Sequence, residues 1–199
     1  MQPVVPFVGL TGGMGAGKST ALKLLEELGA QVLSTDAVVH DLYGESQVRD
    51  AVVERWGAQV APAGVVDRAA IAAEAFSGAE QERKWLEDLL WPLVGARMGK
   101  WLEQARALRL APKAAVVEVP LLFEAGMESG FDATIAVIAQ EDTRRARAAT
   151  RDHALADERA GRQLSQEEKA ARASFVIHND GTEADLRREL ADVLAKLSG

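Results

Sequence analysis

Gly12-Gly13-Met14-Gly15-Ala16-Gly17-Lys18-Ser19-Thr20 directly follows an apolar run, Val4 to Leu10. The stretch matches G-x-x-x-x-G-K-S, the P-loop pattern, in which glycines let successive backbone N–H groups point into one anion-sized hollow. Residues 18–28 have a helical composition and end at Gly29, a common residue just beyond a helix. Because a strand, a glycine-rich loop and a helix succeed one another here, we predict a phosphate-binding loop rather than a turn that matches by chance.

The P-loop pattern assigns a role to each residue type. Lys18 is expected to bridge the β- and γ-phosphates of ATP, and the Ser19 hydroxyl to bind Mg²⁺. The start of the following helix adds unpaired N–H groups and the positive end of its dipole. The predicted nucleotide-binding residues are Gly13, Met14, Gly15, Ala16, Gly17, Lys18, Ser19 and Thr20.

Composition limits the classes of protein to consider. The 199 residues suit one domain, and 48% of them are hydrophobic, enough for a sizeable core. The net charge of −7 disfavours a broad nucleic-acid-binding face but allows a local basic pocket for a phosphorylated ligand. There is no cysteine, no signal-peptide pattern and no apolar run long enough to span a membrane. We therefore expect a cytoplasmic protein, and no obligate protein partner is evident.

The apolar pattern predicts an α/β fold with five parallel strands, at residues 4–10, 30–34, 113–119, 132–138 and 174–177. Between the second and third strands the pattern is helical, over residues 37–43, 46–56, 67–76 and about 79–109. Pro92 is expected to kink the last of these or divide it in two. Later helices are expected at 141–150 and at 182–197, where Thr182 and Asp185 resemble a capping box.

Candidate reacting groups follow the strand ends, where ligands gather in sheets of this kind. Asp36 comes after the second strand, where a carboxylate could take a proton from an acceptor hydroxyl or help to hold Mg²⁺. Asp36 could equally be the N-cap of the next helix. His40 lies one turn later and could face the same cleft. We favour an outward-facing, structural position for Glu118 in the third strand.

Arginines are concentrated between the fourth and fifth strands. They could belong to a lid that covers a triphosphate, or to a solvated face paired with nearby carboxylates. Trp85 and Trp101 could stack on adenine, but their helical spacing favours core packing. The arginines are Arg144, Arg145, Arg147, Arg151, Arg159 and Arg162.

The chain resembles the dephospho-coenzyme A kinase family over nearly its full length. The resemblance rests on Gly9 to Ser19, on Ser34-Thr35-Asp36 and on Val119-Pro120-Leu121-Leu122-Phe123-Glu124, with further similarity at Arg151-Asp152, Arg159, Gln163 and 176–181. Two positions depart from the family pattern. Ser34 stands where the family usually has aspartate, and Trp91 stands where it usually has histidine before Pro92.

The resemblance implies a P-loop NTPase fold with a nucleotide-binding core (1–36, 111–143 and 171–199), a helical acceptor subdomain (37–110) and a lid (144–170). It implies transfer of the γ-phosphoryl group of ATP, with Mg²⁺, to the ribose 3′-hydroxyl of dephospho-coenzyme A. Lys18, Asp36, Arg147 and Arg159 would be catalytic, and Asn179 and Gly181 would lie near the adenine. Asp36, His40, Pro120, Leu121, Leu122 and Phe123 would bind the acceptor.

Two other functions fit parts of the pattern. A nucleoside monophosphate kinase would share the sheet, the acceptor insertion and the arginine-rich lid, but it does not predict the Pro-Leu-Leu-Phe-Glu segment at 120–124. A nucleotide-binding switch would predict a guanine-reading Asn-Lys-x-Asp segment, which is absent from the sequence.

Overall fold

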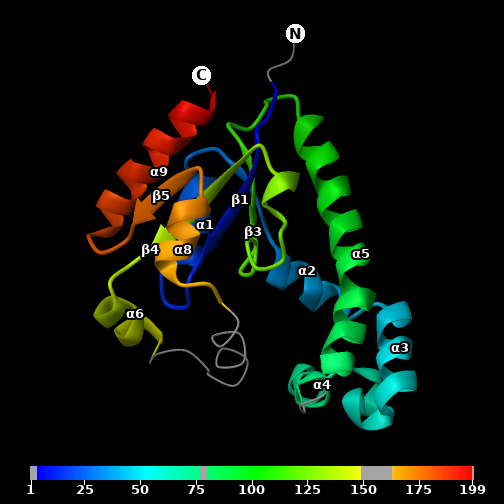
Figure 1. Ribbon diagram of the computed structural model, residues 1–199. Coiled ribbons are helices and arrows are strands. Elements are labelled where there is room, and N and C mark those ends of the chain that lie inside the picture. The colour runs from blue at the N-terminus through cyan, green and yellow to red at the C-terminus, as the bar shows by residue number, and fades with distance from the viewer. Residues whose placement is uncertain (1–3, 77–79, 149–162, 199) are drawn as a thin grey trace.

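A five-stranded, all-parallel sheet forms the centre of the molecule (Figure 1). The computed structural model describes residues 4–76, 80–148 and 163–198. Its strand order is β2-β3-β1-β4-β5, which confirms the predicted fold class. The strands are β1 (Phe7–Gly12), β2 (Gln31–Ser34), β3 (Ala115–Glu118), β4 (Ala133–Ile138) and β5 (Phe175–His178).

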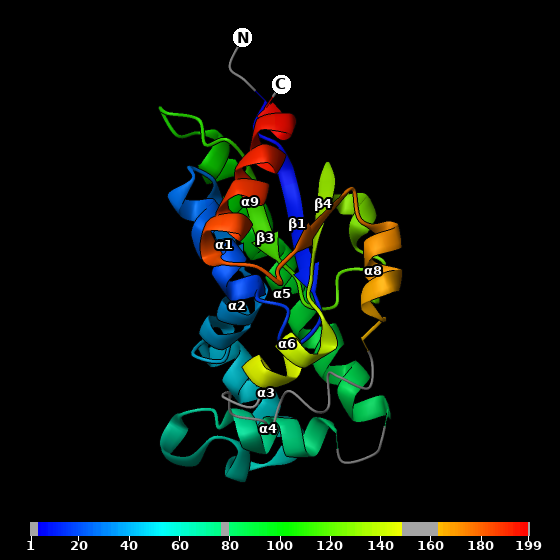
Figure 2. The same cartoon turned by 90° about the vertical axis from the view of Figure 1, so that its left-hand side faces the viewer.

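Helices cover both faces of the sheet, as the apolar character of its strands requires. On one face, α1 (Lys18–Glu27) and α9 (Glu183–Ser198) pack against β1 and β4 through a buried cluster that includes Leu24, Leu190 and Val8. Figure 2 shows α8 (Gln166–Arg172) on the opposite side of the sheet from α1 and α9. Between β4 and α8 lies α6 (Glu141–Ala148), and residues 149–162 are outside the described part of the chain.

The segment between β2 and β3 is a helical block that projects from one edge of the sheet (Figure 1). Its helices are α2 (Thr35–Leu42), α3 (Ser46–Trp56), α4 (Arg68–Ala75) and α5 (Glu80–Arg106), with short 3₁₀ turns at Ala58–Val60 and Pro62–Gly64. As predicted, the described residues of this block contain no strand. None of the described helices combines the length and apolarity needed to cross a membrane.

Helix α5 runs through Pro92 as one helix, so the division into two helices that Pro92 suggested is wrong. Proline removes one backbone hydrogen bond from a helix. That loss is offset here by an apolar stripe that packs on both sides of it, because Leu86, Leu90, Val94 and Met98 are all buried in one cluster. Trp85 and Trp101 pack beside the same cluster, which fits their predicted core role.

The ends of two elements and the burial of one strand residue differ from the sequence prediction. The strand predicted from residue 4 begins at Phe7, and Val4 is exposed. Thr35 and Asp36, predicted to end the second strand, are the first turn of α2. Glu118 is buried rather than outward-facing, because β3 is covered on both faces.

The start of α9 is a reciprocal cap, as the sequence predicted. The Asp185 N–H donates to the Thr182 hydroxyl at 3.2 Å, and the Asp185 carboxylate accepts from the Thr182 N–H at 3.0 Å and from its hydroxyl at 2.7 Å. The Thr182 hydrogen bonds, with a smaller contribution from Arg188, lower the pKa of Asp185 from 3.8 to about 2. The cap therefore favours the ionised carboxylate in the folded protein.

Removing this cap should destabilise the protein modestly. We expect Thr182→Ala to lower the melting temperature at pH 7 by about 2–4 °C, because a helix end loses its side-chain partner. The matched control is Ser46→Ala, which removes an exposed hydroxyl from the first residue of α3, a helix without a side-chain cap among the described residues. Equal melting temperatures for the two variants would contradict the prediction.

The Asp185 contribution should also depend on pH. Since the folded pKa lies below the unfolded value, its stabilisation is present above about pH 3.8 and is lost as the pH falls toward 2. Thermal unfolding of the wild type and of Asp185→Asn should therefore differ at pH 6 and converge toward pH 2. A difference that persists unchanged at pH 2 would show that ionisation is not involved.

Candidate active site

The P-loop follows β1 and adopts a backbone that requires glycine at two positions. Gly15 and Gly17 have φ values of 73° and 95°, in the left-handed region that other residues rarely adopt. A Cβ atom on Gly15 would collide with the carbonyl of Arg144, and one on Gly17 would collide with the side-chain amide of Asn179. The loop is therefore closely surrounded by the segments that follow β4 and β5.

Three hydrogen bonds hold the loop in this shape. The Lys18 ammonium donates to the Gly13 carbonyl at 3.1 Å, which folds the side chain back over the loop. The Met14 N–H donates to the side chain of Gln163 at 3.3 Å. The Asn179 side chain donates to the Ala16 carbonyl at 2.8 Å. The loop is thus fixed from within by Lys18, and from outside by Gln163 and Asn179, which lie 149 and 163 positions from their partners in the sequence.

The start of α1 supplies the anion-binding features that the motif predicts. Gly17 is its N-cap, and no side chain in the described part of the chain caps the helix, so its first N–H groups face outward. Ser19 lies exposed in this first turn. Because Mg²⁺ in such sites is held by few protein oxygens, several waters and the substrate phosphates, an exposed hydroxyl beside Lys18 fits the predicted metal ligand. The described residues contain no cluster of three metal-ligating side chains.

A hollow of about 330 Å³ lies beside the P-loop. Gly15, Gly17 and Thr20 form one side of it, and Arg147, Asn179 and Gly181 form another. The Arg147 guanidinium donates to the Asn179 carbonyl at 3.0 Å. The structure therefore brings Arg147, Asn179 and Gly181 next to the phosphate-binding loop, where they were expected from the sequence.

A second hollow, of about 430 Å³, lies between α2, α5 and the segment after β3. Its walls are mostly apolar side chains, such as Val94 and Met98 of α5. Pro120 and Leu121 contribute the sheet side, and Asp36 contributes a carboxylate. We call this hollow the acceptor cavity. Trp91, the departure from the family pattern, stands at its rim with 51% of its surface exposed.

Asp36 sits in the first turn of α2, at the carboxyl end of β2. It is not the N-cap of that helix, because Ser34 occupies the N-cap position. The Thr35 hydroxyl donates to the Glu118 carbonyl at 3.0 Å, which ties the start of α2 to the end of β3. Since β3 separates β2 from β1, the ends of β2 and β1 lie about 10 Å apart. Asp36 and the P-loop therefore follow strands that only β3 separates, at the same edge of the sheet.

Some predicted acceptor residues lie elsewhere. His40 is exposed on α2 and is not part of the acceptor cavity wall, although Val39 beside it is. Leu122 and Phe123 are 0% and 2% exposed and pack in the core beneath the helical block, so they support the cavity rather than line it. Their apolar side chains follow Pro120 directly, and sequence alone did not separate wall from core. Arg159 lies outside the described residues.

Two further residues contact the site: Gln163, which the sequence analysis named only as part of the family resemblance, and Lys169, which it missed. Gln163 accepts from the P-loop, as described above. Lys169 is completely buried on α8. A signal for this helix was present, because Ser165 and Glu168 form a capping box, but the burial of Lys169 depends on a partner 45 positions earlier.

The geometry of Gly17 yields a direct test of the loop. Gly17→Ala should weaken ATP binding at least about tenfold, because the added methyl group is strained at this φ and collides with Asn179. The measurement is titration of the purified protein with a fluorescent ATP analogue. The control is Gly99→Ala on α5, where a Cβ meets no atom within 4 Å and the helix propensity improves. Unchanged affinity in Gly17→Ala would contradict this account of the loop.

Comparison with known proteins identifies a family. The family model for dephospho-CoA kinase matches residues 6–185. A dephospho-CoA kinase from Deinococcus radiodurans is 40% identical over 96% of this chain and 91% of its own, and one from Anaeromyxobacter dehalogenans is 38% identical over 96% and 92%.

Solved structures agree as well. A crystal structure of a Thermus thermophilus protein has a TM-score of 0.79 and 33% identity, and the match covers 98% of this chain and all of that one. Dephospho-CoA kinase from Campylobacter jejuni, at 23% identity, shares the fold with a TM-score of 0.69 over 96% of each chain. The chain therefore belongs to the dephospho-CoA kinase family of P-loop kinases.

Proposed function

We propose that this protein transfers the γ-phosphoryl group of ATP to the ribose 3′-hydroxyl of dephospho-coenzyme A, giving coenzyme A and ADP. One observation carries the proposal: the P-loop and Asp36 follow strands that only β3 separates, at the carboxyl edge of one sheet, and the acceptor cavity opens beside Asp36. Membership of the dephospho-CoA kinase family supports the identity of the acceptor. We also propose that the reaction takes place in the cytoplasm.

On the donor side, the protein binds phosphates and neutralises their charge. The backbone N–H groups of residues 13–17 and the start of α1 surround the β- and γ-phosphates. Lys18, now folded onto the Gly13 carbonyl, reaches the same oxygens as a point charge. Ser19 is the residue that would hold Mg²⁺, which neutralises charge on the transferred group.

On the acceptor side, the protein places a hydroxyl in line with the γ-phosphate. Asp36 accepts a hydrogen bond from the 3′-hydroxyl and either orients it or takes its proton as it attacks. The apolar walls formed by α5 and by Pro120 and Leu121 bury the less polar parts of the acceptor. Arg147, in the hollow beside the P-loop, and Arg159 are our candidates to stabilise charge on the triphosphate.

Acceptor specificity can be tested by coupled ADP release with ATP and Mg²⁺. We expect rapid turnover with dephospho-coenzyme A, and little with AMP, with CMP or without an acceptor. Chelation of Mg²⁺ should abolish turnover. Faster turnover with a nucleoside monophosphate would overturn the proposed acceptor while leaving the P-loop assignment intact.

Asp36→Asn should lower kcat by about 10²–10⁴-fold, the usual contribution of a positioned acid or base, with ATP binding retained. The control is Asp41→Asn, which removes an exposed carboxylate from the same helix and should leave kcat unchanged. If Asp36→Asn keeps wild-type kcat, Asp36 has no role in the chemical step.

A further inference from the structure

A buried ion pair joins α8 to the segment that follows β3. The Lys169 ammonium of α8 is 2.7 Å from a carboxylate oxygen of Glu124, and the two side chains are 0% and 11% exposed. Lysine is rarely buried completely unless it is paired. The second Glu124 carboxylate oxygen is also buried, so both groups are held away from bulk water.

The Lys169 ammonium contacts the ends of two neighbouring strands. It donates to the Pro120 carbonyl at 3.1 Å and approaches the Thr11 hydroxyl at 3.5 Å. The Thr11 hydroxyl itself donates to the same Pro120 carbonyl at 3.3 Å. Thr11 precedes the first glycine of the P-loop, and Pro120 forms part of the acceptor cavity wall. One charged group therefore joins the root of the phosphate-binding loop to the wall of the acceptor cavity.

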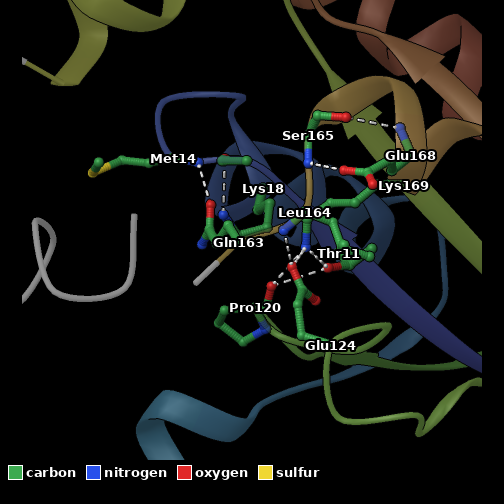
Figure 3. A network of polar contacts seen from close by, with 11 residues as sticks. Thr11, Met14, Lys18, Pro120, Glu124, Gln163, Leu164, Ser165, Glu168 and Lys169 are labelled. Carbon is green, nitrogen blue, oxygen red and sulfur yellow. Dashed lines mark hydrogen bonds and ion pairs between the residues drawn. The ribbon is translucent and has the colours of Figure 1, made fainter. Parts of the chain in front are cut away.

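Glu124 extends this connection to the outer side of the P-loop. The carboxylate oxygen that binds Lys169 also accepts from the Leu164 N–H at 2.8 Å. The preceding residue, Gln163, accepts from the Met14 N–H of the P-loop. Figure 3 shows these contacts as one network that links Thr11, Pro120, Glu124, the 163–164 segment and Met14.

We propose that Lys169 and Glu124 are positioning residues, which set the P-loop relative to the acceptor cavity for phosphoryl transfer. The inference rests on the proposed kinase activity. Neither side chain belongs to the described walls of the two hollows, so both act through Thr11, Pro120 and the 163–164 segment. In-line transfer depends on placement, and an error of about 1 Å can cost on the order of 100-fold in rate.

A purely stabilising role is the competing explanation. A buried ion pair is a weak source of stability, because desolvation offsets the attraction, and apolar or neutral replacement of both partners is often neutral or better. The contacts of this pair also fall on the Pro120 carbonyl, the Thr11 hydroxyl and the Leu164 N–H, which adjoin the acceptor cavity and the P-loop, rather than on polar groups elsewhere in the core. These two observations favour positioning.

The test uses kcat, the two KM values and the melting temperature of the full-length enzyme. Lys169→Met alone leaves Glu124 buried without its cation and should lower the melting temperature by about 10 °C. The double variant Lys169→Met with Glu124→Gln removes both charges, while the glutamine oxygen can still accept from Leu164. We expect the double variant to recover most of the melting temperature but to keep a kcat about 100-fold below wild type, with KM for ATP and for dephospho-coenzyme A near wild-type values.

The matched control is Arg172→Met. Arg172 lies one turn later on α8, pairs with Glu128 of the same connection after β3, and is 41% exposed. We expect its kcat to equal that of the wild type. This control separates the loss of any α8 ion pair from the loss of the buried one.

The outcomes distinguish failure of the positioning role from failure of the proposed kinase function. A double variant that recovers both melting temperature and kcat would show that the pair only stabilises the fold, and would overturn the inference. If the wild type releases no ADP with dephospho-coenzyme A, the proposed function fails. The same kcat comparison is then made with whichever acceptor supports turnover, and a kcat equal to wild type in the double variant again overturns the positioning role.

Discussion

All five strands run in the same direction, and this one constraint places the whole site. Parallel strands end at a common edge, so residues that are far apart in sequence meet there. The P-loop follows β1, Asp36 follows β2, Pro120 follows β3 and Asn179 follows β5. Four of the five strand ends thus contribute a segment to the candidate site, and the sheet hydrogen bonds fix the spacing between them. The candidate site is therefore held by the ends of hydrogen-bonded strands rather than by long loops.

Backbone carbonyls are the points at which these segments are joined. The Asn179 side chain binds the Ala16 carbonyl, the Thr35 hydroxyl binds that of Glu118, and Lys169 and Thr11 share that of Pro120. Because a carbonyl is present whatever the side chain, such contacts fix the path of the chain without engaging the side chains of the residues whose carbonyls accept. In the strand order, β3 lies between β1, which leads into the P-loop, and β2, which leads into Asp36. The segment after β3 therefore contacts Thr11 on one side and lines the cavity with Asp36 on the other.

Local patterns were enough to predict the five strands, the P-loop and the cap at Thr182, because each depends on residues close in sequence. The place of Asp36 at a strand end followed from strand order along the chain, whereas Arg147 and Asn179 were named from the family resemblance; all three line one of the two hollows. Burial could not be predicted in the same way. Lys169 lies in a charged segment and was missed, since its burial requires Glu124, and Leu122 and Phe123 were indistinguishable from their half-buried neighbours. Glu118 was placed outward because the second covering layer of β3 arises from distant helices.

The helical block leaves the sheet at β2 and returns at β3, and these two strands are direct neighbours. Helix α5, about 40 Å long for its 27 residues, brings the chain back to the start of β3. The block is thus an excursion between adjacent strands, and β1, with its P-loop, lies outside it in the hydrogen-bonded order. Insertions or replacements within such an excursion leave the pairing of the sheet intact. If the block binds the acceptor, as we propose, acceptor preference can change in evolution while the P-loop half stays the same, and a substitution such as the tryptophan at position 91 can occur without affecting ATP binding.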